Sequence, residues 1–312
     1  MKIIFILFTL FCSTLASATP LNKIVVFGDS LSDNGNLYEY MQRELPLSPP
    51  YFKGRFTNGP VWVELLTNHY YPNDAQAHLL DYAFGGAGVS DINDDNKDDE
   101  DDVLFTLSRE IDSYLLSHHD KADDTSLYVV WMGANNYLAI PDDVEQSVAQ
   151  VTGGIKHELE RLVQKGAKHI MVVNVPDLGR TPAAKDFDAV DLLTTLSVRH
   201  NVVLKDVVSE LERKDASVHW YYFNVNDIID ELLNYPERNG VTNITDSCYE
   251  AMVNEPSSRS ILKMVSSVKA RKSVDACSGY LFFDLVHPSE VAHVMMEKRT
   301  RKMLDDAGVT FE

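Results

Sequence analysis

Short apolar runs alternate with longer amphipathic stretches along this chain, and this alternation constrains its fold more than any other feature. Runs rich in β-branched and aromatic residues predict buried strands at 23–27, 79–84, 127–132, 169–175 and 218–224. Apolar residues at helical spacing predict helices over 61–69, 103–118, 144–165 and 190–213. A last helix is expected from Pro288 to Leu304, because proline suits a first helical turn. Strands separated by helices predict an α/β fold, with a parallel sheet covered on both faces.

The first 18 residues have the pattern of a secretory signal. Met1-Lys2 gives a positive start, and the apolar run 3–11 is too short to span a bilayer as a helix. Ala16-Ser17-Ala18 then resembles a cleavage site. A lipoprotein signal at Cys12 is disfavoured, because the residue before it is the large Phe11. We therefore expect an exported protein, periplasmic or extracellular, whose mature part starts at residue 19.

Residues 19–312 are expected to form a single domain, because no repeat or linker divides them. The formal net charge of −19 argues against nucleic-acid partners and against attraction to anionic membranes. No segment after the signal is long and apolar enough to predict a transmembrane anchor. Two cysteines remain, Cys248 and Cys277, and in an exported protein they predict one disulfide.

The segment 91–102 is strongly acidic, with eight acidic residues in twelve. Its spacing loosely resembles a calcium-binding EF-hand loop. Asn96 replaces the turn glycine of such a loop, however, and Asp102 replaces its final glutamate. A solvated acidic loop is the favoured interpretation, and no metal or other cofactor is expected.

Four polar patterns follow predicted strands in an order that suggests catalysis. Ser30 ends the first strand, where open parallel sheets place their ligands. Gly85-Gly86 follows the second strand, and paired glycines let backbone N–H groups approach a substrate oxygen. Asn135 follows the third strand and can donate into the same space. Asp284 lies three residues before His287, close enough to hold the imidazole in one tautomer.

These residues resemble a known enzyme family. The run Gly28-Asp29-Ser30-Leu31, followed in order by Gly86, Asn135 and His287, is similar to the GDSL lipases of the SGNH hydrolase family. Runs 54–62 and 175–182 support the resemblance, which covers residues 23–293. Within that family, the chain most resembles secreted bacterial lysophospholipases A and the related glycerophospholipid–cholesterol acyltransferases. The resemblance implies a flavodoxin-like three-layer α/β/α sandwich with a five-stranded parallel sheet, acting on lipid acyl esters.

The resemblance also implies a role for each site residue. Ser30 would be the nucleophile, His287 its general base and Asp284 the group that orients the imidazole. The oxyanion hole would consist of the N–H groups of Ser30 and Gly86 and the side-chain amide of Asn135. The chain departs from the family at the next position. Asn136 stands where the family usually has aspartate, which keeps a hydrogen-bonding group but removes a charge.

The predicted disulfide would close a loop, 248–277, that is basic in an otherwise acidic chain. Its cations are Lys263, Lys269, Arg271 and Lys272. A basic loop just before Asp284 is a good protease target. One hypothesis is that the loop is a lid whose cleavage by a protease activates the enzyme; the other is a plain surface loop.

We therefore expect an exported serine ester hydrolase, most simply a lysophospholipase A that releases fatty acid from lysophospholipids. Acyl transfer to an alcohol is a second outcome of the same chemistry. The alternatives are a carbohydrate O-acetylesterase or a thioesterase with the same triad. A binding protein without catalysis is disfavoured, because all four patterns occur together.

Overall fold

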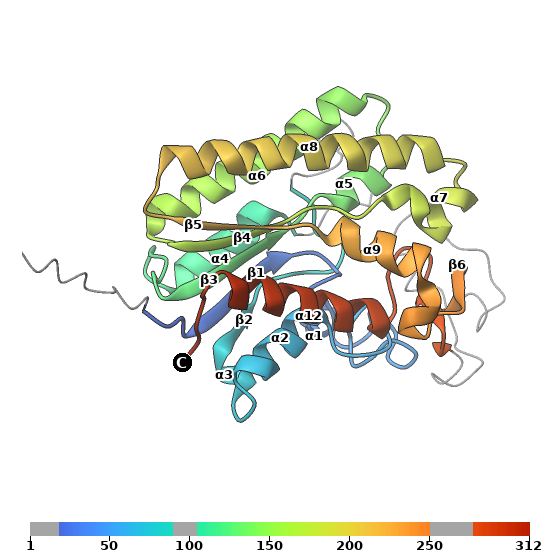
Figure 1. Cartoon of the computed structure of the whole chain (residues 1–312), viewed down its shortest axis with the longest axis horizontal. Coiled ribbons are helices and arrows are strands. Elements are labelled where there is room, and N and C mark those ends of the chain that lie inside the picture. Colours follow the sequence, from blue (N-terminus) through green and yellow to red (C-terminus); the bar gives the residue numbers. More distant parts are fainter. Residues whose placement is uncertain (1–18, 90–104, 250–276) are drawn as a thin grey trace, which may run out of the picture.

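The computed structural model describes residues 19–89, 105–249 and 277–312, and the structural statements below concern those residues. At its centre lies a five-stranded parallel sheet with the strand order β2-β1-β3-β4-β5 (Figure 1). The strands are β1 (Lys23–Gly28), β2 (Leu79–Asp81), β3 (Ser126–Trp131), β4 (His169–Val173) and β5 (His219–Phe223). This is the flavodoxin-like, doubly wound order, in which ligands bind at the carboxyl ends of the strands.

Helices cover both faces of the sheet, as the alternating sequence pattern predicts. One face packs on α4 (Leu107–Ser117), α6 (Val144–Lys165) and α8 (Val190–Lys214). The other packs on α2 (Trp62–Tyr70), α9 (Val225–Asn234) and α12 (Glu290–Asp306). Alternate residues of β3 enter the two cores: Tyr128 packs with the first group of helices and Val129 with the second. The expected three-layer sandwich is therefore confirmed.

Shorter elements connect these layers. They are α1 (Asn36–Tyr40), α3 (Ala75–His78), α5 (Ala134–Leu138), η1 (Leu178–Arg180), α7 (Pro182–Asp186) and η2 (Pro236–Asn239). A second, two-stranded parallel sheet pairs β6 (Asn243–Ser247) with β7 (Tyr280–Phe282). The sequence pattern did not predict this small sheet, because its strands are short and neither carries a long apolar run.

Several element boundaries differ from the predictions by one to four residues, and specific contacts explain two of them. Strand β2 ends at Asp81 instead of residue 84, because the Asp81 carboxylate accepts the N–H of Ala83 and turns the chain towards the paired glycines. Helix α12 begins at Glu290, with Ser289 as its N-cap, so Pro288 precedes the helix instead of opening it. Pro288 is held by an isolated bridge to Phe282.

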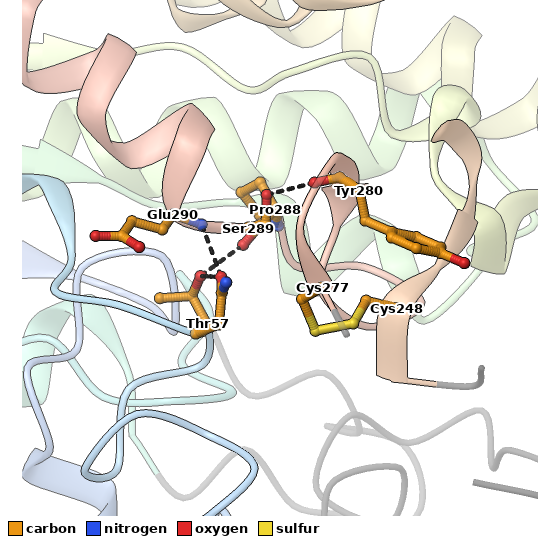
Figure 2. The surroundings of a disulfide bond; sticks show 8 residues. Thr57, Cys248, Cys277, Tyr280, Pro288, Ser289 and Glu290 are labelled. Atoms are coloured by element: carbon orange, nitrogen blue, oxygen red, sulfur yellow. Dashed lines mark hydrogen bonds between the residues drawn. A yellow bond between two sulfur atoms is a disulfide. The ribbon is translucent and has the colours of Figure 1, made fainter. Parts of the chain in front are cut away.

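The structure joins Cys248 and Cys277 in the disulfide that the sequence predicts (Figure 2). The bridge belongs to a small buried cluster beside the main sheet. Its other members are Leu37, Tyr51, Phe56, Tyr249 and Phe283. Phe283 directly precedes Asp284, so this cluster lies against the segment that carries two of the predicted catalytic residues.

Three predictions fall outside the described residues: the signal at 1–18, the acidic segment 91–102, and the basic residues of the 248–277 loop. Those basic residues are Lys263, Lys269, Arg271 and Lys272. Within the described part of the chain, no helix is both long and apolar enough to cross a membrane.

Candidate active site

Ser30 lies in a tight turn at the carboxyl end of β1. The backbone carbonyl of Asp29 accepts the N–H groups of both Ser32 and Asp33, each at 3.0 Å, and this closes the turn. The Asp29 carboxylate accepts the N–H of Leu31 at 3.0 Å. These bonds fix the backbone on both sides of Ser30, whose side chain is nearly buried at the end of the sheet.

The structure brings Ser30, His287 and Asp284 together as the sequence predicts. Nε2 of His287 lies 2.7 Å from the Ser30 hydroxyl oxygen, although 257 residues separate the two in sequence. Nδ1 of His287 lies 2.6 Å from Oδ2 of Asp284. The imidazole therefore bridges a hydroxyl and a carboxylate, which is the geometry in which it can accept the hydroxyl proton.

The Asp284 carboxylate is buried but well supplied with hydrogen-bond donors. Its Oδ1 accepts the backbone N–H groups of His287 at 2.7 Å and Val286 at 2.9 Å, so the aspartate closes its own turn. Burial by itself raises the pKa of Asp284. The charge of His287 and the hydrogen bonds from His287 and Val286 outweigh burial and hold this pKa below its usual value. Asp284 is thus kept ionised beside the imidazole.

The segment after His287 is anchored by two residues of the run 54–62. Thr57 donates its hydroxyl to the carbonyl of Pro288 at 2.9 Å, and Asn58 accepts the N–H of Glu290 at 2.8 Å (Figure 2). Ser289 donates its hydroxyl to the carbonyl of Tyr280 at 2.6 Å. These bonds fix where α12 begins and thereby where His287 lies.

Asp33 links the Ser30 turn to the glycine pair that follows β2. One carboxylate oxygen accepts the N–H groups of Gly35 and Asn36, and the other accepts those of Leu37 and Gly85. Gly86 then adopts a positive φ of 80°, which favours glycine. Among the described residues, no acceptor takes the N–H of Ser30 or Gly86, so both remain available to a substrate oxygen.

Asn135 lies at the start of α5 and lines the same pocket as Ser30 and His287. Its side-chain nitrogen donates one hydrogen to the carbonyl of Ala87 at 2.7 Å, and this bond fixes the orientation of the amide group. The second hydrogen of the same nitrogen can then be donated to a substrate oxygen. The neighbouring Asn136 accepts the N–H of Val89 at 2.9 Å through its side-chain oxygen. An aspartate, which the family usually has at this position, could accept the same hydrogen bond through a carboxylate oxygen. Asn136 therefore preserves this contact although it lacks the charge.

A pocket opens beside Ser30 and His287. Most of the side chains around it are apolar, and they come from the carboxyl ends of the strands, from η1 and from helices of both layers. The apolar lining consists of Leu31, Trp131, Ala134, Leu138, Pro176, Leu178, Ile229, Phe282, Val286, Pro288 and Met296. Pro176, Asp177, Leu178 and Thr181 explain why the motif run 175–182 accompanies the catalytic motifs: all four border the pocket.

Asp29 also borders the pocket, next to the nucleophile. Burial raises the pKa of Asp29 to about 6, against the opposing effects of the Leu31 N–H and the charge of His287. Asp29 therefore changes charge near pH 6, beside the triad. Within the described ranges, no group of His, Cys, Asp and Glu side chains is arranged to hold a metal ion.

Sequence reasoning missed Tyr51, whose hydroxyl donates to Oδ2 of Asp284 at 2.7 Å. Tyr51 lies in an irregular, proline-rich segment, 233 residues before Asp284. No spacing rule connects two such positions. The only indication in the sequence was that the run 54–62, which supports the family resemblance, begins three residues after Tyr51.

Comparison with known proteins identifies the family. The profile of the GDSL-like lipase/acylhydrolase family matches residues 24–300. The chain belongs to this family. It is therefore an ester hydrolase of the GDSL type, in which lipases and acyltransferases share one fold.

One relative of this GDSL protein is named for an activity on lipids. The chain is 32% identical over 309 residues to a phosphatidylcholine-sterol acyltransferase of Aeromonas hydrophila, covering 90% of each chain. It is 29% identical to the secreted effector protein SseJ of Salmonella typhimurium, over 89% of this chain and 62% of that one. It is 25% identical to a thermolabile hemolysin of Vibrio parahaemolyticus, over 92% of this chain and 64% of that one.

Solved structures similar to this GDSL protein are more distant. A lipolytic G-D-S-L family protein from Veillonella parvula shares 14% identity with a TM-score of 0.46, covering 90% of this chain and 96% of that one. A catalytic mutant of the acetylxylan esterase Axe2 from Geobacillus stearothermophilus shares 12% identity with a TM-score of 0.48, covering 95% and 97%.

Proposed function

We propose that Ser30, His287 and Asp284 are the catalytic triad of this ester hydrolase. Neutral His287 accepts the Ser30 proton as the serine oxygen attacks the ester carbonyl. The imidazolium, stabilised by ionised Asp284, then gives that proton to the leaving alcohol. Water, activated by the same imidazole, cleaves the acyl-enzyme and releases the fatty acid.

The proposed oxyanion hole consists of the N–H groups of Ser30 and Gly86 and the side-chain amide of Asn135. All three follow strand ends at the same edge of the sheet. The two N–H groups donate to no acceptor among the residues that the structure describes, and the Asn135 amide is fixed by its hydrogen bond to the carbonyl of Ala87. Donors held in place before the reaction stabilise the developing oxyanion without reorganising.

The proposed substrate class is lysophospholipids, and the apolar pocket beside Ser30 is the observation that carries it. A fatty acyl chain needs an apolar site next to the nucleophile, and most of the side chains around this pocket are apolar. The relatives named for phosphatidylcholine and for haemolysis also point to lipids. A lysophospholipid has one acyl chain, which one pocket can hold.

Acyl transfer is proposed as a second activity of the same site. The relative at 32% identity is named for transfer from phosphatidylcholine to a sterol. Transfer requires only that an acceptor alcohol replaces water at the acyl-enzyme, so the triad and oxyanion hole serve both reactions. An acetylesterase is less well supported, because a pocket lined mostly by apolar side chains suits a hydrocarbon chain better than an acetyl group.

The proposed organisation is a signal at residues 1–18 that directs export, followed by one catalytic domain at 19–312. The name of one relative, a secreted effector, supports export. We also propose that a protease activates the enzyme by cleaving the loop between Cys248 and Cys277, which the disulfide would keep attached. Comparing activity before and after limited proteolysis tests this.

The experiment that tests the function measures fatty-acid release from lysophosphatidylcholine, diacyl phosphatidylcholine and an acetylated sugar. Wild type and Ser30→Ala are compared, with cholesterol present or absent. Serine-dependent release mainly from the lysolipid, with sterol ester formed when cholesterol is present, supports both proposals. Activity on the acetylated sugar alone would keep the triad but contradict the lipid substrate.

A further inference from the structure

The Asp284 carboxylate has a second side-chain partner besides His287. Its Oδ2 atom accepts the imidazole Nδ1–H at 2.6 Å and also the hydroxyl of Tyr51 at 2.7 Å. The other oxygen, Oδ1, accepts two backbone N–H groups. Tyr51 therefore completes the hydrogen bonding of a buried carboxylate and does so at the oxygen that faces the imidazole.

Tyr51 can act only as the donor in this bond. Ionised Asp284 has no proton to give. Burial and the nearby negative charge of Asp284 raise the pKa of Tyr51 well above its ordinary value, so the phenol keeps its proton at any working pH. The direction of the bond is thus fixed.

A neighbouring tyrosine shows that packing does not explain this hydroxyl. Tyr51 and Tyr249 lie in one buried aromatic cluster, with ring centroids 5.2 Å apart, and both rings contact Phe283. The Tyr249 hydroxyl is buried but has no hydrogen-bond partner in the described part of the chain. The two tyrosines share their surroundings, and only the hydroxyl of Tyr51 meets Asp284.

We propose that Tyr51 is a positioning residue for catalysis, whose hydroxyl holds Oδ2 of Asp284 in line with Nδ1 of His287 and takes up part of the carboxylate charge. This proposal rests on the triad proposed above. Tyr51 does not touch the substrate or the reacting atoms; it acts through Asp284.

Two consequences follow from losing this hydroxyl. The carboxylate can rotate away from the imidazole, so the fraction of correctly oriented His287 falls and kcat falls with it. The charge on Oδ2 is also shared with one donor fewer, so it stabilises the imidazolium more strongly. The acid limb of the pH–rate profile should therefore move to higher pH.

The other titratable groups around the His287–Asp284 pair lie in three separate parts of the chain. Asp29 lies in the turn after β1, Tyr249 follows β6, and His293 lies on α12. All three stay in place when only the Tyr51 hydroxyl is removed. A shift of the acid limb in that variant is therefore assigned to the lost hydrogen bond.

The test compares Tyr51→Phe with the matched control Tyr249→Phe on a soluble p-nitrophenyl ester. For Tyr51→Phe we expect kcat to fall about tenfold, with little change in KM and the acid limb moved upwards by about half a pH unit. Tyr249→Phe should keep the wild-type kcat and profile. Equal losses in both variants, or a wild-type profile for Tyr51→Phe, would overturn the proposal.

A double-mutant cycle with Asp284→Asn separates this proposal from the triad itself. If Tyr51 acts through Asp284, Tyr51→Phe should cause no further loss of kcat in the Asp284→Asn background. Additive losses would overturn the proposal while leaving the triad intact. If Ser30→Ala or Asp284→Asn kept wild-type kcat, the triad would be wrong, and the role of Tyr51 would fall with it.

Discussion

Gly28, the last residue of β1, donates its backbone N–H to Oε2 of Glu110 on α4 across 2.8 Å. This bond ties the end of the strand that carries the nucleophile to the helix layer beside it. Both residues are buried, and Oε1 of Glu110 has no hydrogen-bond partner in the described ranges. Burial raises the pKa of Glu110 well above its ordinary value and so favours the neutral form of its carboxyl group.

Because burial favours the neutral form of Glu110, glutamine should be able to replace it. Glu110→Gln keeps an acceptor for Gly28 and is expected to leave stability and activity close to wild type. Glu110→Ala leaves the Gly28 N–H buried without a partner and should cost about 2–3 kcal/mol of unfolding free energy. Chemical denaturation of both variants measures this. A large loss in Glu110→Gln would show that the ionised form matters.

Asp29 should make stability depend on pH. Its pKa is about 6 in the folded protein against 3.8 unfolded, so the folded state binds the proton more tightly. Its stabilising contribution is full below pH 3.8 and is lost as the pH rises to about 6. The stability of wild type relative to Asp29→Asn should therefore fall by about 3 kcal/mol across this window and stay constant above it. Denaturant titrations at several pH values test this prediction. It would be contradicted if the unfolding free energies of wild type and Asp29→Asn changed with pH in the same way.

Asn135 should affect the transition state more than substrate binding. Asn135→Ala removes one proposed oxyanion donor, and kcat should fall about 10²–10³-fold with KM nearly unchanged. Steady-state kinetics on a short-chain ester measures both constants, and the melting temperature checks the fold. A variant that kept its kcat would remove Asn135 from the oxyanion hole.

Ile229 on α9 should limit the length of the acyl chain, because its side chain lines the apolar pocket. Ile229→Phe narrows the pocket, so kcat/KM for a palmitoyl ester should fall about tenfold or more, while an acetyl ester is affected little. The matched control is Ile228→Phe, a buried neighbour on the same helix that does not line the pocket. Equal effects of both variants on both esters would show general damage to the core.

The Cys248–Cys277 disulfide should stabilise the fold substantially. It links positions 29 residues apart, and a loop of that length corresponds to about 3–4 kcal/mol in the chain-entropy model. Replacing both cysteines by serine should lower the unfolding free energy by this amount. Reducing the wild-type protein should give the same denaturation midpoint as the variant. An unchanged midpoint in both would contradict the prediction.

Local sequence patterns were sufficient to predict the main sheet and to single out Ser30, Asp284 and His287 as candidates. A strand such as β3 is apolar from Leu127 to Trp131, and the Asp284 carboxylate accepts the backbone N–H of His287 within one short turn. Tyr51 and Glu110 could not be predicted, because each reaches its partner across the fold from a distant segment. The start of α12 was misplaced at Pro288 because the contact that decides it, from Thr57, is also long-range.

The distance along the chain between Ser30 and His287 sets an order of assembly for the enzyme. During synthesis the serine emerges first, and its base follows only after the strands and most of the covering helices have been made. An unfinished chain therefore carries the serine without the imidazole that activates it. For an enzyme whose proposed substrates are membrane lipids, we therefore expect activity only once the chain has been completed beyond His287.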